Sequence, residues 1–145
     1  MSSRFTVNVP LPMGCGDPEY LAVFEKVLHP VAREFKPELI LVSAGFDIYG
    51  GDPLGGMRVT PEGFAGLTRS VMDLALSCCD GRVVLTLEGG YNVEGLAESV
   101  KRVLIEMAGL TTTDVGELAS HADPEFTDVI VRSVREYHEP HWKNL

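Results

Sequence analysis

Two short apolar runs, each followed at once by glycine and an acidic residue, constrain this chain more than any other feature. LILVSA at residues 39–44 leads into GFD, and VVLTL at residues 83–87 leads into EGGYN. Runs of this length that are apolar throughout are typical of strands in a parallel sheet that is covered on both faces. An amphipathic segment lies between the two runs, so the pattern predicts parallel strands joined by a crossover helix.

The amphipathic segments carry recognisable helix starts. Asp17, Thr60 and Asp123 are each followed by proline, the combination of a capping side chain and a residue suited to the first helical position. Apolar residues then recur at helical spacing, which predicts helices over 17–36, 60–79, 92–109 and 123–139. Residues 5–11 alternate apolar and polar side chains, as a strand or an extended segment does. The order of elements predicts a layered α/β structure on a parallel sheet.

Composition and charge limit the kinds of molecule that this chain is expected to bind. The chain has 145 residues, enough for one domain or a piece of a larger one, and a formal net charge of −9 with no cluster of basic residues. We therefore expect no nucleic acid and no membrane surface as partner. No apolar run approaches the roughly 20 residues of a membrane span, and the N-terminus lacks a signal-peptide core, so we expect a cytoplasmic protein. The cysteines, Cys15, Cys78 and Cys79, are expected to be reduced thiols.

Asp47 places a carboxylate at the end of a buried strand, where a charge needs a partner. In open α/β sheets, ligands bind beyond the carboxyl ends of the strands. If the two strands are neighbours, Asp47 and Tyr91 open onto one cleft, and Gly89 and Gly90 allow the backbone to approach closely. A carboxylate that holds a metal beside a phenol that donates to an oxyanion would suit hydrolysis.

The same residues have plainer interpretations, which the spacing leaves open. Asp47 can cap its own turn, and Tyr91 can be a partly buried aromatic at the start of a helix. Glu88 and Asp52 are interpreted as turn or supporting residues rather than as catalytic groups.

Three stretches in this order and spacing, LVSAGFD, DPLGGMRVTPEGF and GRVVLTLEGGYNVEGLAESV, resemble the C-terminal half of the zinc-dependent histone deacetylase family. The likeness is to class II members and to bacterial deacetylases and acetylpolyamine amidohydrolases, and it extends from about Phe5 to Gly109. It implies a three-layer α/β/α sandwich on a parallel sheet, the arginase/deacetylase fold, present here in part. The family substrate would be acetyl-lysine or an acetylpolyamine.

The resemblance also implies residue roles. Asp47 would be a zinc ligand, and Tyr91 would hydrogen-bond the substrate carbonyl and stabilise the tetrahedral oxyanion. Gly89 and Gly90 would line the acyl-lysine channel, with Leu54 near its wall or mouth. Tyr49 departs from the family, where a smaller residue or histidine is frequent.

The resemblance also implies that several catalytic groups are absent from these 145 residues. The family's other two zinc ligands and its pair of adjacent histidines come from an earlier segment, whereas a catalytic zinc takes three protein ligands. His29, His121, His138 and His141 adjoin no motif and are not expected to replace them. We therefore expect weak or no zinc binding and no activity from the isolated chain, the single C-terminal portion (1–145) of a deacetylase domain.

Three hypotheses about the chain follow. It is the C-terminal portion of a deacetylase-like amidohydrolase, a non-catalytic module that associates through its exposed sheet edge, or one half of a split enzyme. Because half a sheet exposes unpaired strand groups and apolar surface, we predict association, either as a homodimer or with an N-terminal half.

Overall fold

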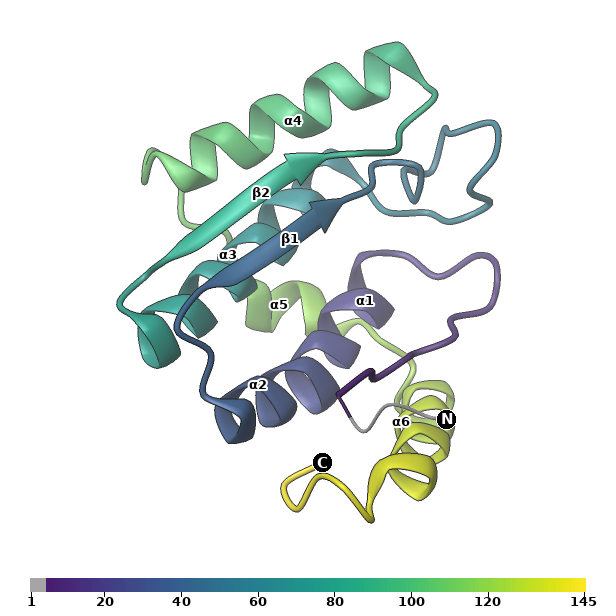
Figure 1. Cartoon of the computed structure of the whole chain (residues 1–145). Helices are drawn as coiled ribbons and strands as arrows, with labels where there is room; N and C mark the ends of the chain where they lie inside the picture. Colours follow the sequence, from purple (N-terminus) through teal and green to yellow (C-terminus); the bar gives the residue numbers. More distant parts are fainter. Residues whose placement is uncertain (1–4) are drawn as a thin grey trace.

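The protein's structure, a computed structural model, describes residues 5–145, and the first four residues of the N-terminal segment lie outside the described part. Strands β1 (Ile40–Ala44) and β2 (Val83–Leu87) are parallel neighbours, paired in register from Ile40 with Val83 to Ala44 with Leu87. Helix α3 (Pro61–Cys79) joins them (Figure 1). The two apolar runs therefore form the predicted strand–helix–strand unit.

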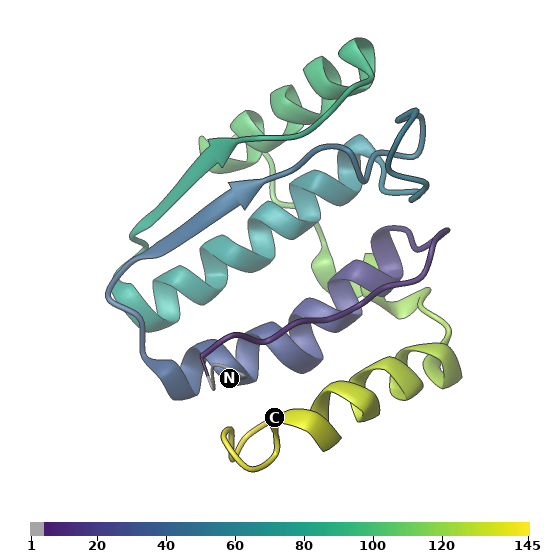
Figure 2. The ribbon, with the colours of Figure 1, turned by 45° about the vertical axis from the view of Figure 1, so that its right-hand side comes forward.

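The first long helix is continuous but irregular. It comprises α1 (Asp17–Val23), the π-helical turn η1 (Phe24–Leu28) and α2 (His29–Phe35), and it runs beside α3 (Figure 2). Pro30 lies in the first turn of α2 and cannot donate a backbone hydrogen bond, so a wider turn before it is a physically reasonable adjustment. The helix ends at Phe35, and the capping residue Lys36 adopts a left-handed conformation with φ 56°. The spacing predicted this helix but not its π turn.

The remaining helices begin at side-chain caps. Thr60 accepts a hydrogen bond from the Gly63 N–H at the start of α3, and Asn92 accepts one from the Gly95 N–H at the start of α4 (Val93–Met107). Helix α5 (Val115–Ser120) and helix α6 (Pro124–His138) follow, and Asp123 caps α6 through two backbone N–H groups. Such caps satisfy donors that the first turn of a helix leaves unpaired.

The N-terminal segment differs from the strand interpretation of residues 5–11. It carries no strand in the structure and is extended instead. Its alternating apolar side chains pack on a second hydrophobic cluster between η1 and α6, rather than on a sheet. The packed residues are Val7, Val9 and Leu11, against Val23, Val27, Val131 and Val134. The two-residue period therefore indicated correctly that one side of this segment is buried. In the described chain, however, the segment pairs with no strand.

Helices cover only one face of the two-stranded sheet. Ala44 and Leu85 pack against the main core, which includes Phe64 and Leu67 of α3 and Val103 of α4. On the opposite face, side chains of β1 and β2 remain exposed: 72% for Leu41 and 47% for Val84. The prediction that both faces are covered is therefore wrong for residues 5–145, because the described chain places its crossover helix and α4 on the same side.

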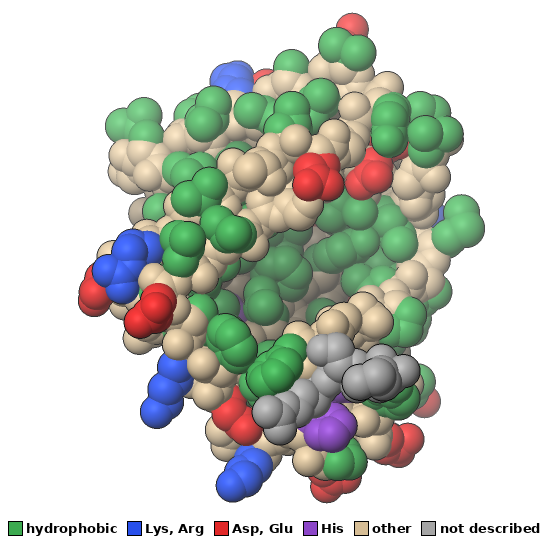
Figure 3. All heavy atoms as spheres, viewed as in Figure 1, with side chains coloured by type: hydrophobic (Ala, Val, Ile, Leu, Met, Phe, Trp, Pro, Cys, Tyr) green, Lys and Arg blue, Asp and Glu red, His purple; other side chains and the backbone are tan. Residues whose placement is uncertain are grey.

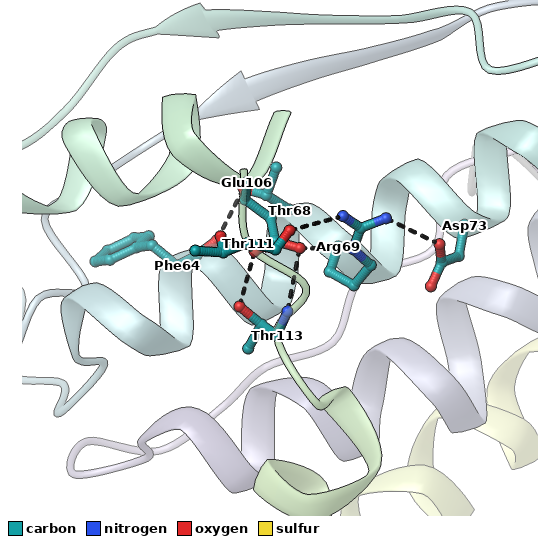
Figure 4. A network of polar contacts seen from close by, with 7 residues as sticks. All are labelled: Phe64, Thr68, Arg69, Asp73, Glu106, Thr111 and Thr113. Carbon is teal, nitrogen blue, oxygen red and sulfur yellow. Dashed lines mark hydrogen bonds and ion pairs between the residues drawn. The ribbon is translucent and has the colours of Figure 1, made fainter. Parts of the chain in front are cut away.

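A buried ion pair fastens α3 to α4 and to the segment after it (Figure 4). The Glu106 side chain is fully buried and accepts a hydrogen bond from Arg69 Nε at 2.6 Å. Thr111 and Thr113 donate to the same carboxylate. Burial disfavours the charged form, but these hydrogen bonds outweigh it and hold the pKa of Glu106 below its ordinary value. The network fixes the layer that supports β1 and β2.

Candidate functional site

The carboxyl ends of β1 and β2 meet at one edge of the sheet, and backbone hydrogen bonds join the loops beyond them. Glu88 N–H donates to Ala44 O at 3.0 Å, and Phe46 N–H donates to Gly89 O at 2.8 Å. The GFD and EGGYN segments are thus held side by side. This confirms the condition under which the sequence placed Asp47 and Tyr91 at the same edge.

The Asp47 carboxylate lies against two glycines. A Cβ at Gly89 would be 2.8 Å from Asp47 Oδ2, and one at Gly45 would be 3.0 Å from Asp47 Oδ1. A larger residue at Gly89 would therefore displace the carboxylate. Within residues 5–145 no hydrogen bond to the Asp47 side chain is formed, so the carboxylate does not cap its own turn. Its oxygens remain available to a ligand.

Asp52 fastens the Asp47 loop to the Tyr91 loop. Its Oδ2 accepts from the Tyr91 backbone N–H at 2.7 Å, and its Oδ1 accepts from Leu54 N–H at 2.8 Å and Gly55 N–H at 3.2 Å. Partial burial disfavours its charge, but these hydrogen bonds outweigh it and hold the pKa of Asp52 below its ordinary value. Asp52 is thus a turn residue, as predicted, and it also fixes the backbone from which Tyr91 projects.

Tyr91 and Leu54 project from these fastened loops into solvent. The Tyr91 side chain is 57% exposed and Leu54 is 71% exposed. Gly90 adopts φ +133°, a conformation that strongly favours glycine, and this turns the chain between the sheet and Tyr91. The structure therefore presents the phenol at the sheet edge. It does not place the phenol in contact with Asp47.

Tyr49, the departure from the family pattern, packs inward. A Cβ at Gly95, in the first turn of α4, would be 2.2 Å from the Tyr49 ring. The Tyr49 ring therefore covers the start of α4, and its position requires a residue without a side chain at Gly95.

Tyr20, in α1, is a residue near Asp47 that the sequence did not single out. Burial raises the pKa of its phenol, and the nearby charges of Cys15 and Asp47 raise it further. The signal was present in the sequence, because Tyr20 stands four residues before Phe24 and continues the apolar side of the helix. It was missed because tyrosine at that position was not counted in the apolar pattern.

The described residues do not complete a zinc site. Within residues 5–145, no three His, Cys, Asp or Glu side chains are grouped so that they could hold a metal ion. Asp47 alone supplies one oxygen donor group, whereas a catalytic zinc takes three protein ligands. His29 hydrogen-bonds Ser70 at 2.9 Å, and His138 is buried at the end of α6, so neither contributes. In the same described part, no helix has the length and hydrophobicity to cross a bilayer.

Comparison with known proteins identifies the family of the chain. Residues 1–107 match the histone deacetylase domain. Histone deacetylase 18 of Arabidopsis thaliana is 42% identical over 146 residues, covering 97% of this chain and 20% of the relative. Polyamine deacetylase HDAC10 of Homo sapiens is 43% identical over 142 residues, with the same two coverages. The chain therefore belongs to the histone deacetylase family.

Solved structures give the same result for the fold. The histone deacetylase Clr3 superposes with a TM-score of 0.81 at 33% identity, over 94% of this chain and 22% of that protein. The HDA15 HD domain superposes with a TM-score of 0.76 at 34% identity, over 94% of this chain and 35% of that domain. These matches confirm the predicted partial arginase/deacetylase fold. The chain spans about a fifth of the length of the curated relatives named here.

Proposed function

We propose that this chain is the C-terminal portion of the catalytic domain of a deacetylase that hydrolyses the acetamide of acetyl-lysine or of an acetylpolyamine. The observation that carries the proposal is the sheet edge at which Asp47, free of hydrogen bonds in residues 5–145, lies against Gly89 while Asp52 holds the Tyr91 backbone. Family membership and the named histone and polyamine deacetylase relatives support it.

The proposed roles follow the chemistry of each group. Asp47 contributes one carboxylate ligand to a zinc site whose other ligands come from outside these residues. Tyr91 donates its phenolic hydrogen to the oxygen that becomes negatively charged during acetamide hydrolysis, a form of stabilisation that requires the donor to be fixed in advance. Gly89, Gly90 and Leu54 border the path of the acyl chain. Bound zinc would polarise the acetamide and activate water.

The proposal is tested by an acetyl-lysine peptide hydrolysis assay with added zinc. The isolated chain is expected to show no turnover, because the described part provides one zinc ligand. Mixed with the part of a relative's deacetylase domain that this chain does not match, it is expected to give turnover that Tyr91→Phe lowers by about 100-fold to 1,000-fold. A parallel assay with an acetylpolyamine identifies the preferred substrate class. Turnover by the isolated chain would contradict the proposed division of the site.

A second candidate, a non-catalytic module that associates through its sheet edge, is favoured by the open edge of β1, which has no strand partner in residues 5–145. If the mixture forms a stable complex without turnover under the same conditions, this candidate replaces the first. The cytoplasmic location expected from the sequence stays a prediction.

A further inference from the structure

Two hydrogen bonds join the loop at residues 51–55 to the segment that carries Tyr91. The Tyr91 N–H donates to Asp52 Oδ2 at 2.7 Å, and the side-chain amide of Asn92 donates to Gly51 O at 2.8 Å. The bonded residues are 39 and 41 positions apart in the sequence, so both bonds are tertiary contacts between the two strand ends.

The 51–55 loop also lies on the backbone of Asp47. Asp52 Oδ1 accepts hydrogen bonds from the N–H groups of Leu54 and Gly55, which fold the loop into a turn. A Cβ at Gly55 would overlap the carbonyl oxygen of Asp47, so the turn packs directly on the backbone of that residue. The loop therefore contacts the backbone of both Asp47 and Tyr91, the two residues to which the proposed function gives a chemical role.

The position of Tyr91 depends on its backbone. Figure 3 shows hydrophobic side chains gathered on the loops beyond the strands, at the right of the view, and the Tyr91 side chain is among the exposed ones. Within residues 5–145 its hydroxyl forms no hydrogen bond. Gly89 and Gly90 precede it, and glycine restrains the backbone less than other residues do. The bond from the Tyr91 N–H to Asp52 therefore restrains the chain directly after two flexible positions.

We propose that Asp52 and Asn92 are positioning residues for deacetylation, because they make the position of the Tyr91 phenol depend on the 51–55 loop. The inference rests on the proposed function, since it takes Tyr91 as the donor to the oxyanion. Such a donor is effective only when it is fixed before the charge develops, and a misplacement of about 1 Å can lower the rate roughly 100-fold. Loss of either hydrogen bond is therefore expected to lower kcat and to leave KM nearly unchanged.

Two isosteric substitutions each remove one of these hydrogen bonds and keep the local structure. In Asp52→Asn, the amide oxygen can still accept the two N–H groups of its own turn, which leaves the NH₂ group facing the Tyr91 N–H. In Asn92→Asp, the carboxylate can still cap α4, but it has no hydrogen to donate to Gly51 O.

Amide hydrogen exchange of the purified chain tests the contact itself. We expect the Tyr91 amide to exchange at least about tenfold faster in Asp52→Asn than in the wild type. The control is Asp80→Asn, which changes an aspartate with an 87% exposed side chain before the opposite end of β2, and it should leave this exchange unchanged. Equal exchange of the Tyr91 amide in the wild type and Asp52→Asn would overturn the inference.

Kinetics test whether the contact acts through the phenol. The enzyme is a chimera in which this chain replaces the matching segment of the Clr3 deacetylase domain, assayed with added zinc on an acetyl-lysine peptide. Asp52→Asn and Asn92→Asp are each expected to lower kcat by about 10-fold to 100-fold, while KM stays nearly constant. In a Tyr91→Phe background, Asp52→Asn should cause no further loss, because the hydroxyl that it positions is absent.

Three kinetic outcomes would overturn the inference. They are full kcat in both substituted chimeras, a change confined to KM, and losses that multiply when Asp52→Asn is combined with Tyr91→Phe, as a general structural effect would produce. Failure of the proposed function looks different: the wild-type chimera shows no turnover, although exchange of the Tyr91 amide still depends on Asp52.

Discussion

Glu106→Gln is the substitution whose effect the structure defines most closely. The wild-type carboxylate is fully buried and accepts four hydrogen bonds, from Arg69 Nε, Thr111 Oγ1, Thr113 N–H and Thr113 Oγ1. Glutamine has nearly the same shape, but one of its two acceptor oxygens becomes an NH₂ donor. If that NH₂ replaces Oε1, it faces Arg69 Nε and Thr113 N–H, which cannot accept a hydrogen bond. If it replaces Oε2, the two threonine hydroxyls can accept, and what is lost is the negative charge that pairs with Arg69.

Removal of one partner of a buried ion pair costs about 3–5 kcal/mol. We expect the lower end, about 3 kcal/mol, because Arg69 keeps a contact with Asp73 at 3.6 Å and its side chain is 17% exposed. For a domain of this size that corresponds to a melting temperature lower by roughly 6–12 °C.

Thermal and urea unfolding at neutral pH measure the effect, with Glu98→Gln as the control. Glu98 lies on the same helix, but its side chain is 43% exposed and pairs with Lys101 and Arg102 at the surface. The control is expected to melt with the wild type. If Glu106→Gln also melts with the wild type, the network does not join α3 to α4 as argued.

The wild type and Glu106→Gln also test how the contribution of Glu106 to stability depends on pH. The pKa of Glu106 is lower in the folded state than in the unfolded chain, so its contribution is full above the ordinary carboxyl pKa of 4.5. The contribution is lost as the pH falls through the folded-state pKa. The stability difference between wild type and Glu106→Gln should therefore shrink on acidification, and a difference that grows instead would contradict the assignment.

Two further predictions concern the packing around α3. Gly63→Ala places a Cβ 1.9 Å from Asp17 Oδ1 and is expected to cost about 1–3 kcal/mol in unfolding free energy. Gly116→Ala, where the added Cβ would meet Asp114 Oδ1 at an ordinary contact distance of 3.4 Å, should be neutral or slightly stabilising. Burial, and then the charge of Arg33, lower the pKa of His29 below its ordinary value of 6.5, although the hydrogen bond with Ser70 opposes this. The free energy of unfolding should therefore fall as the pH drops below about 6.5. Urea titrations at several pH values should show that His29→Gln removes this part of the pH dependence. An unchanged pH dependence in His29→Gln would contradict the prediction.

Local sequence patterns predicted the elements that local rules determine. The helix starts at Thr60 and Asp123 follow from capping chemistry, and the parallel β1–β2 pair follows from two apolar runs separated by one crossover helix. The prediction that Asp17 caps the first helix is wrong: the helix is capped at Gly16, and the Asp17 carboxylate accepts hydrogen bonds from Thr60 N–H and Oγ1 instead. Residues 5–11 were ambiguous because a two-residue period reports burial on one side and not the identity of the neighbour. In the structure that neighbour is the cluster between η1 and α6.

Some features of the candidate site could likewise be predicted from local sequence, whereas others depend on how distant segments pack. Asp47 and Tyr91 were singled out because each lies within a few residues of the carboxyl end of a strand, and strand ends are local features. The hydrogen bond from the Tyr91 N–H to Asp52 joins residues that are 39 positions apart in the sequence. The proximity of Tyr20 to Asp47 depends on how α1 packs. Neither contact follows from the spacing of residues in the sequence. The apolar runs also predicted cover on both faces of the sheet, which residues 5–145 do not provide.

Asp47 is proposed to belong to a catalytic centre, and this is tested by kcat/KM on an acetyl-lysine peptide for a chimera. In it, this chain replaces the matching segment of the Clr3 deacetylase domain. Asp47→Asn is expected to lower kcat/KM by more than about 100-fold, beyond the roughly 10–100-fold typical of residues that only support a metal ligand. Glu88→Gln, an exposed carboxylate at the same strand ends, should leave it unchanged. Full activity in a folded Asp47→Asn chimera would contradict the account.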